Sequence, residues 1–200
     1  MEKTVDYFMN PSSPWTFLGH GRLREICALH NASIRIKPID VGARVFPVSG
    51  GLPLAKRAPQ RQSYRLVELE RWRKLRGVPL NLHPKHFPTP ADEACRLIIA
   101  ADQLHGEDAA MKLAEHLMRA IWIEERDIGD TQTLRAIVHA CDLPVEAMYH
   151  QIPQTHQVFD ANTQEAIDRG VFGVPWYVYR DEPFWGQDRL EFLERALAQA

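Results

Sequence analysis

The order of strand-like and helix-like segments constrains this chain more than any single residue does. β-favouring residues fill residues 4–9, and apolar residues then recur at helical spacing from Trp15 to the closing pair His30-Asn31. Residues 33–41 alternate between apolar and polar side chains with a period of two. Strand, helix and strand in this order pack as one unit, so we expect the chain to begin with a β-α-β unit of an α/β domain.

The middle of the chain has a different character. Helical patterns follow one another from about residue 51 to Gly170, with little strand signal between them. The expected helices are one before Gly77 with Leu66, Leu69, Trp72 and Leu75 along one face, one from Thr89-Pro90 to Gly106, one around residues 113–124, one from Thr131 to Cys141, and one over residues 162–169. Strand character returns at residues 176–179 and 184–185, and a last helix is expected from Gln187.

The resulting order is β-α-β, a block of helices, and then β-β-α. If both ends of the chain build one sheet, this order predicts a thioredoxin fold that carries a large helical insertion. The thioredoxin-like domain is then discontinuous, with residues 1–50 and 171–200, and residues 51–170 form the helical insertion domain. We expect the insertion to hang over the edge where the first helix begins.

Charge and cysteine usage exclude several classes of protein. Lys and Arg number 24 against 26 Asp and Glu, so no broad cationic surface is expected for nucleic acid or anionic lipid. No apolar run approaches the ~18 residues of a membrane span. The cysteines Cys27, Cys95 and Cys141 lie far apart, without Cys-x-x-Cys or zinc-ligand spacing. We therefore expect a cytoplasmic protein without a metal site.

The start of the first helix is the position to examine for chemistry. In a thioredoxin-like fold the reactive group lies there, because free backbone N–H groups and the helix dipole favour an anion. Redox members of the fold place Cys-Pro-x-Cys at this position, whereas here it reads Ser13-Pro14-Trp15-Thr16. Both sulfurs are replaced by hydroxyls, so dithiol exchange by these side chains is excluded. The alternative interpretation is that Ser13 is only an N-cap.

Two C-terminal features are consistent with a chemical role for the start of the first helix. Val174-Pro175 leads directly into the third strand and is a candidate cis peptide, which would turn backbone groups toward the first helix. Asp188 and Arg189 open the last helix, where a carboxylate could bind the ammonium group of a ligand. Each feature is common by itself, but the three occur at consistent topological positions.

These motifs resemble those of a known family, the 2-hydroxychromene-2-carboxylate isomerases, which are related to kappa-class glutathione transferases within the DsbA-like thioredoxin fold. The resemblance covers nearly the whole chain. It is carried by Ser13 to Leu18 with Arg22-Leu23, Ile39-Asp40, Tyr64-Arg65, Arg71-Trp72, Gly77 to Pro79, Phe172 to Pro175 and Trp185 to Leu190.

The resemblance implies glutathione as cofactor and a set of residues that bind it. Ser13 would face the glutathione sulfur as the catalytic residue, Val174 would pair with the cysteinyl backbone, and residues 185–188 would hold the γ-glutamyl end. The full expected glutathione-binding set is Ser13, Arg65, Val174, Pro175, Trp185, Gly186, Gln187 and Asp188. The relatives also imply a homodimer.

A basic segment is the candidate substrate side. Residues 44–76 hold nine Lys and Arg against two Glu, and glutathione and a chromene carboxylate are both anionic. The expected substrate-binding residues are Arg44, Lys56, Arg57 and His86. Arg57, Arg61 and Arg65 would share one helix face if the helix begins that early, and a solvated helix face is the alternative interpretation. Ala55 stands where some isomerases carry Asn, a departure that concerns the substrate more than the cofactor.

Together with the resemblance, these features predict a glutathione-dependent isomerase that acts on a small aromatic carboxylate. The thiolate would add to a conjugated carbon, allow bond rotation and leave. Two alternatives stay open, namely glutathione transfer onto electrophiles and a non-catalytic thioredoxin-like binding module. His83 and His86 have His-x-x-His spacing, but no Cys or carboxylate close in sequence completes a metal site.

Overall fold

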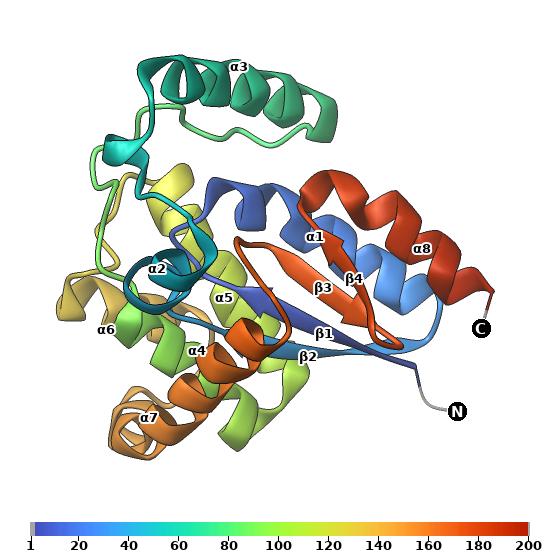
Figure 1. The fold of residues 1–200 in the computed structure, drawn as a ribbon. Helices are drawn as coiled ribbons and strands as arrows, with labels where there is room; N and C mark the ends of the chain where they lie inside the picture. Colours follow the sequence, from blue (N-terminus) through green and yellow to red (C-terminus); the bar gives the residue numbers. More distant parts are fainter. Residues whose placement is uncertain (1–2, 200) are drawn as a thin grey trace.

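The two ends of the chain build one mixed sheet. The computed structural model describes residues 3–199, and its sheet has the order β2-β1-β3-β4 (Figure 1). The strands are β1 (Lys3–Met9), β2 (Ala32–Pro38), β3 (Trp176–Tyr179) and β4 (Glu182–Trp185). β1 pairs with β2 in parallel and with β3 antiparallel, and β3 pairs antiparallel with β4. This confirms the predicted β-α-β start and β-β-α end.

Helices, helical turns and the loops between them make up the rest of the described chain. In chain order they are α1 (Pro14–Leu29), the π-helical turn η1 (Val41–Val45), α2 (Phe46–Ser49), the 3₁₀ turn η2 (Leu54–Lys56), α3 (Pro59–Arg76), α4 (Asp92–His105), α5 (Glu107–Trp122), α6 (Thr131–Ala140), α7 (Val145–Asp168), the 3₁₀ turn η3 (Gln187–Arg189) and α8 (Leu190–Ala198). Figure 1 shows α1 and α8 side by side against the sheet, α4 to α7 grouped together, and α3 standing apart above them. In the described part of the chain, no helix is long and apolar enough to cross a membrane.

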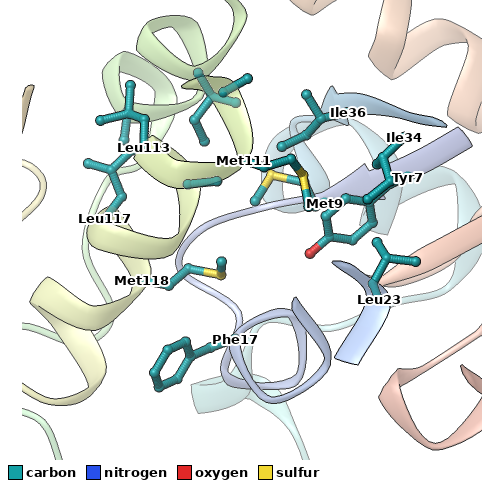
Figure 2. Close-up of a cluster of buried hydrophobic side chains, with 14 of the residues drawn as sticks. Tyr7, Met9, Phe17, Leu23, Ile34, Ile36, Met111, Leu113, Leu117 and Met118 are labelled. Atoms are coloured by element: carbon teal, nitrogen blue, oxygen red, sulfur yellow. The ribbon is translucent and has the colours of Figure 1, made fainter. Parts of the chain in front are cut away.

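The sheet is buried on both faces, as the alternation of strand side chains requires. Tyr7 and Met9 of β1 belong to the large core with α1, α5 and α8, whereas Phe8 points to a second cluster with η1 and the end of α7. Figure 2 shows the large core, where Leu23 of α1 lies beside Tyr7 and Ile34, and methionines of α5 approach from the other side. The thioredoxin-like sheet and the α5 helix therefore share one core.

A buried histidine joins α1 to both the sheet and α5. His20 Nδ1 lies 3.2 Å from the hydroxyl of Tyr7, and its Nε2 lies 3.0 Å from the carbonyl oxygen of Met111 in α5. Burial lowers the pKa of His20 to about 4, although the Met111 carbonyl acts in the opposite direction. The neutral ring donates to Met111 from Nε2 and accepts from Tyr7 at Nδ1, which satisfies both nitrogens. His20 thus fixes the orientation of α1 from which Ser13 projects.

Two predicted boundaries are wrong. The second strand ends at Pro38 and not at residue 41, because the Asp40 carboxylate accepts from the Ala43 N–H and caps the turn η1. The short helix expected over residues 162–169 is the last part of α7, which begins at Val145 and carries Pro153 in its interior. Buried side chains of α7, such as Phe159, continue its packing face past the proline, so tertiary contacts hold the helix together there.

The predicted apolar face of α3 is confirmed only in part, because Leu69 and Trp72 pack in the large core whereas Leu75 does not. Only Leu69 of this helix is buried, and Leu75 is 73% exposed. α3 lies at the edge of the molecule, where it contacts α1, so the apolar spacing alone did not predict that its last turn is exposed (Figure 1). It begins with Pro59 at its first position and ends at Gly77, whose positive φ of 65° closes the helix. Arg57 consequently lies before the helix and not on its face.

Candidate functional site

Ser13 is the N-cap residue of α1, and its hydroxyl also makes a second contact. Its backbone is extended, and its Oγ accepts from the N–H of Thr16 at 3.3 Å. The same hydroxyl donates to the carbonyl oxygen of Val174 at 3.5 Å. Pro14 follows at the first helical position, where its missing N–H costs nothing. The hydroxyl hydrogen of Ser13 is therefore held only by a long bond, and it is free to turn toward an anion.

The loop before β3 brings the second motif to this helix start. The Val174-Pro175 peptide is cis, and the Pro175 carbonyl accepts from the N–H of Gly186 at 2.9 Å. This bond ties the end of β4 to the cis-proline loop. Trp185 lies over Gly173, since a Cβ on that glycine would be 3.0 Å from the indole Nε1. The predicted residues Val174, Pro175, Trp185 and Gly186 are thus neighbours of one another, and Val174 contacts Ser13.

The turn η3 places the last two predicted glutathione residues. Gly186 has φ of 99°, and a Cβ there would lie 2.5 Å from the Asp188 carboxylate, so glycine is required for this turn. The Asp188 side chain is exposed and contacts Arg189 at 2.6 Å. Gln187 points inward and is 2% exposed. A carboxylate and a buried amide therefore lie side by side after β4.

Arg65 lies in an aromatic cage, and no acidic side chain of the described residues forms an ion pair with it. Its guanidinium carbon is 5.4 Å from the ring centre of Phe87 and 6.0 Å from that of Trp122. Within residues 3–199, Arg65 Nη2 and Trp122 Nε1 are buried without a hydrogen-bond partner. Burial, and then the charge of Arg57, lower the pKa of Arg65 to about 10. Two unpaired donors and a desolvated cation make this cage suited to an anionic acceptor.

The other predicted substrate-binding residues do not all lie together. Arg57 donates a hydrogen bond to the carbonyl of Leu52 at 2.8 Å. Burial lowers the pKa of Arg57, and the charge of the nearby Arg61 lowers it further. Lys56 is exposed in η2, and His86 Nδ1 lies 3.7 Å from Asp127. Arg44 instead forms an ion pair at 3.1 Å with Asp160 of α7. The structure thus brings Arg57 near Arg65 and binds Arg44 to another helix.

Sequence reasoning missed Arg76. This last residue of α3 donates from Nη2 to the carbonyl oxygen of Gln187 at 3.4 Å, which joins the helical block to the turn η3. One basic residue among several before a helix-ending glycine gives no signal of such a long-range contact. Trp122 lies in the core, and nothing in the sequence indicates that its N–H has no partner among the described residues.

The protein's own thiols are poorly suited to nucleophilic chemistry. Cys27, Cys95 and Cys141 are free and buried. Burial, with Glu107 as a smaller cause, raises the pKa of Cys27 to about 12. A thiol is reactive as its thiolate, so a raised pKa and burial make these groups inert. A sulfur that reacts near Ser13 has to come from another molecule.

Comparisons with known proteins identify relatives over nearly the whole chain. The 2-hydroxychromene-2-carboxylate isomerase of Sphingobium xenophagum is 29% identical over 199 residues, which cover 98% of this chain and 99% of that protein. Human glutathione S-transferase kappa 1 is 24% identical over 213 residues, which cover 100% of this chain and 92% of that protein. A solved structure of a 2-hydroxychromene-2-carboxylate isomerase superposes with a TM-score of 0.81 at 29% identity, covering 98% and 95% of the two chains.

The fold and the family are therefore settled together. The predicted thioredoxin fold with added helices is confirmed by the sheet order and by the superposition. The family model described as a DSBA-like thioredoxin domain matches residues 4–198. The chain belongs to the DsbA-like thioredoxin domain family.

Proposed function

We propose that this protein is a glutathione-dependent isomerase of 2-hydroxychromene-2-carboxylate or a related intermediate of aromatic degradation. The observation that carries the proposal is the Ser13 hydroxyl, which lies at the start of α1 against the Val174 carbonyl in a protein whose own cysteines are buried. The names of the isomerase relatives support the reaction, and the kappa-class relatives support the cofactor.

Ser13 and the helix start would stabilise the thiolate of bound glutathione. A free thiol with a pKa of about 8.5 is only a few per cent ionised at pH 7. Pro14 has no N–H and the N–H of Thr16 is bonded to Ser13, so helix geometry leaves the N–H of Trp15 as a backbone donor. This donor, the Ser13 hydroxyl and the helix dipole all favour negative charge. Lowering the thiol pKa by about two units requires roughly 2.7 kcal/mol.

The reaction needs no net change in atoms or electrons. Bound glutathione would supply a thiolate that can add reversibly to a conjugated carbon, so that the double bond of the substrate could rotate before the thiolate leaves again. Ser13 would donate a hydrogen bond to that sulfur and would not be a nucleophile itself.

The cage around Arg65 would receive the anionic aromatic substrate. Arg65 supplies the charge, and Phe87 and Trp122 supply apolar walls. Phe17, one turn after Ser13 in α1, and Met118, one turn before Trp122 in α5, belong to the same hydrophobic cluster (Figure 2). The cage and the helix start are therefore linked through one contiguous set of side chains. In this assignment Arg65 serves the substrate, whereas the resemblance had implied a role toward glutathione.

The direct test is the interconversion of the chromene and its ring-opened pyruvate, followed by absorbance. We expect turnover by the purified protein with glutathione and none with S-methylglutathione, which binds without a free thiol. Ser13→Ala should lower kcat by about 10- to 100-fold, because it removes one donor to the thiolate. Unchanged spectra in the presence of glutathione would contradict the proposal.

A glutathione transferase is the second candidate, since kappa-class transferases are among the relatives. It would use the same thiolate but release a stable thioether. Product analysis by mass spectrometry after incubation with glutathione and an aryl halide separates the two activities. Accumulation of the conjugate, without interconversion of the chromene, would favour the transferase.

A further inference from the structure

The loop that carries Ser13 is a tight turn that begins at Asn10. The N–H of Ser13 donates to the carbonyl oxygen of Asn10 at 3.1 Å, which closes a β-turn over Pro11 and Ser12. Asparagine at the first position and proline at the second position are both favoured in such turns. Because the turn uses the N–H of Ser13, the hydroxyl is the donor that this residue can offer to a ligand.

The side chain of Asn10 holds the turn against the rest of the fold. Its Oδ1 accepts from the N–H of Ser12 at 3.0 Å and from the hydroxyl of Ser12 at 2.7 Å. Its Nδ2 donates to the carbonyl oxygen of Ile39, just after β2, at 3.1 Å and to Sγ of the buried Cys95 in α4 at 3.8 Å. An asparagine amide has two acceptor lone pairs and two N–H donors, so its full hydrogen-bonding capacity is used here.

The hydroxyl of Ser13 is not fixed by bonds of its own. It lies 3.3 Å from the N–H of Thr16 and 3.5 Å from the carbonyl oxygen of Val174, and both contacts are long for hydrogen bonds. The backbone of Ser13 therefore decides where the hydroxyl lies, and the turn at Asn10 decides where that backbone lies. A catalytic donor that is misplaced by about 1 Å can lose most of its effect.

We propose that Asn10 is a positioning residue, which holds the Ser13 hydroxyl where it can donate to the sulfur of a bound thiol. The inference rests on the proposed function, because the position of the hydroxyl matters for turnover only if Ser13 faces the glutathione sulfur. Asn10 acts through the turn and has no contact with the ligand. The competing explanation is that Asn10 only supports the fold.

The first experiment measures turnover of the chromene carboxylate with glutathione for Asn10→Ala, Asn10→Ser and the control Asn162→Ala. Asn162 lies in α7 and donates to the carbonyl oxygen of Pro38, at the end of β2, at 3.5 Å. We expect kcat to fall about tenfold in Asn10→Ala and by less in Asn10→Ser, whose hydroxyl can still accept weakly from the N–H of Ser12. The KM for glutathione should change by less than about twofold, and Asn162→Ala should behave as the wild type.

A double-mutant cycle separates positioning from support of the fold. If Asn10 acts through the Ser13 hydroxyl, Asn10→Ala should lower kcat no further in a Ser13→Ala background. If Asn10 only supports the fold, its substitution should lower kcat by the same factor in both backgrounds. Urea denaturation shows which variants are folded, and Asn10→Ser takes the place of Asn10→Ala in the cycle if the latter does not fold.

The second experiment tests the geometry without glutathione, in a Ser13→Cys background. A thiol at a helix N-terminus has a lowered pKa, and the native cysteines are buried, so alkylation by iodoacetamide against pH reports on the introduced thiol. We expect its pKa to lie at least about one unit below 8.5 and to rise by about one unit when Asn10→Ala is added. Adding Asn162→Ala should leave that pKa unchanged.

The two experiments distinguish failure of the inference from failure of the proposed function. An introduced thiol whose pKa does not respond to Asn10→Ala would overturn the inference, and so would equal losses of kcat in the two backgrounds of the cycle. If the introduced thiol responds to Asn10→Ala but the wild type shows no turnover with glutathione, the proposed function fails. The placement of residue 13 by Asn10 would then stand without a role toward glutathione.

Discussion

Two groups of basic side chains have opposite surroundings in this fold. At the sheet, Lys37 of β2 is 6% exposed and contacts Glu165 at 2.6 Å and Asp6 at 3.5 Å. Arg35 and Arg169 join the same carboxylates from the surface, at 3.4 Å from Asp6 and 3.1 Å from Glu165. Every cation of this network therefore has an acidic neighbour.

Three arginines in or next to α3 lack such neighbours. In the described residues Arg57, Arg65 and Arg76 form no ion pair, and each lies over an aromatic ring instead. Burying a charge without a partner is costly, so such an arrangement is maintained where a ligand later provides the partner. We infer that the network at Lys37 serves stability, and we propose that Arg57, Arg65 and Arg76 are placed for anions that come from outside.

The largest effect is expected from breaking the paired network. Lys37→Met should lower the free energy of unfolding by about 3 kcal/mol, because it leaves the buried Asp6 carboxylate without its buried partner. Arg35→Met is the matched control: Arg35 contacts the same carboxylate but is 61% exposed, so its loss should cost less than about 1 kcal/mol. Urea denaturation measures both changes. Equal effects in the two variants would show that burial does not distinguish the two cations.

For Arg65 in the aromatic cage we expect a smaller change in the free energy of unfolding than for Lys37, and a loss of activity instead. Arg65→Met removes an unpaired buried donor, so the free energy of unfolding should stay within about 1 kcal/mol or rise. The kcat/KM for the chromene carboxylate should fall about 10- to 100-fold, as for a lost charged hydrogen bond. Arg71→Met is the control on the same helix, since Arg71 is exposed and paired with Glu68.

The outcome that contradicts this interpretation of Arg65 is the reverse pattern. A loss of more than about 2 kcal/mol in stability with unchanged kcat/KM would place Arg65 with Lys37, as a structural cation. The comparison between the two groups would then be wrong, and the cage would be part of the core.

The parts of this structure that could be predicted are those marked by residues that lie close together in the sequence. A serine before a proline marks the start of α1, and an X-Pro step before apolar residues marks the cis-proline loop, because caps and prolines act over a few residues. Both sides of the candidate helix-start site were therefore found from the sequence. The contact between Ser13 and Val174 confirms that the fold brings these two residues together.

The missed features depend on long-range packing. Arg76 and Gln187 are 111 residues apart, and nothing near either residue in the sequence indicates the other. The interior Pro153 obscured the true length of α7, and α3 lies at the edge of the molecule, so the apolar spacing of Leu75 did not predict burial. Propensity and periodicity predict helices and strands, but tertiary contacts decide which face of each one is buried.

The central claim is that Ser13 receives a thiolate that the protein borrows from glutathione. It is tested most directly by titrating the ultraviolet absorbance of the thiolate in the glutathione complex against pH, for the wild type and Ser13→Ala. We expect the pKa of the bound thiol to lie about two units below that of free glutathione in the wild type, and to rise by at least about one unit in Ser13→Ala. A bound thiol with the pKa of free glutathione, or one that Ser13→Ala leaves unchanged, would contradict the claim.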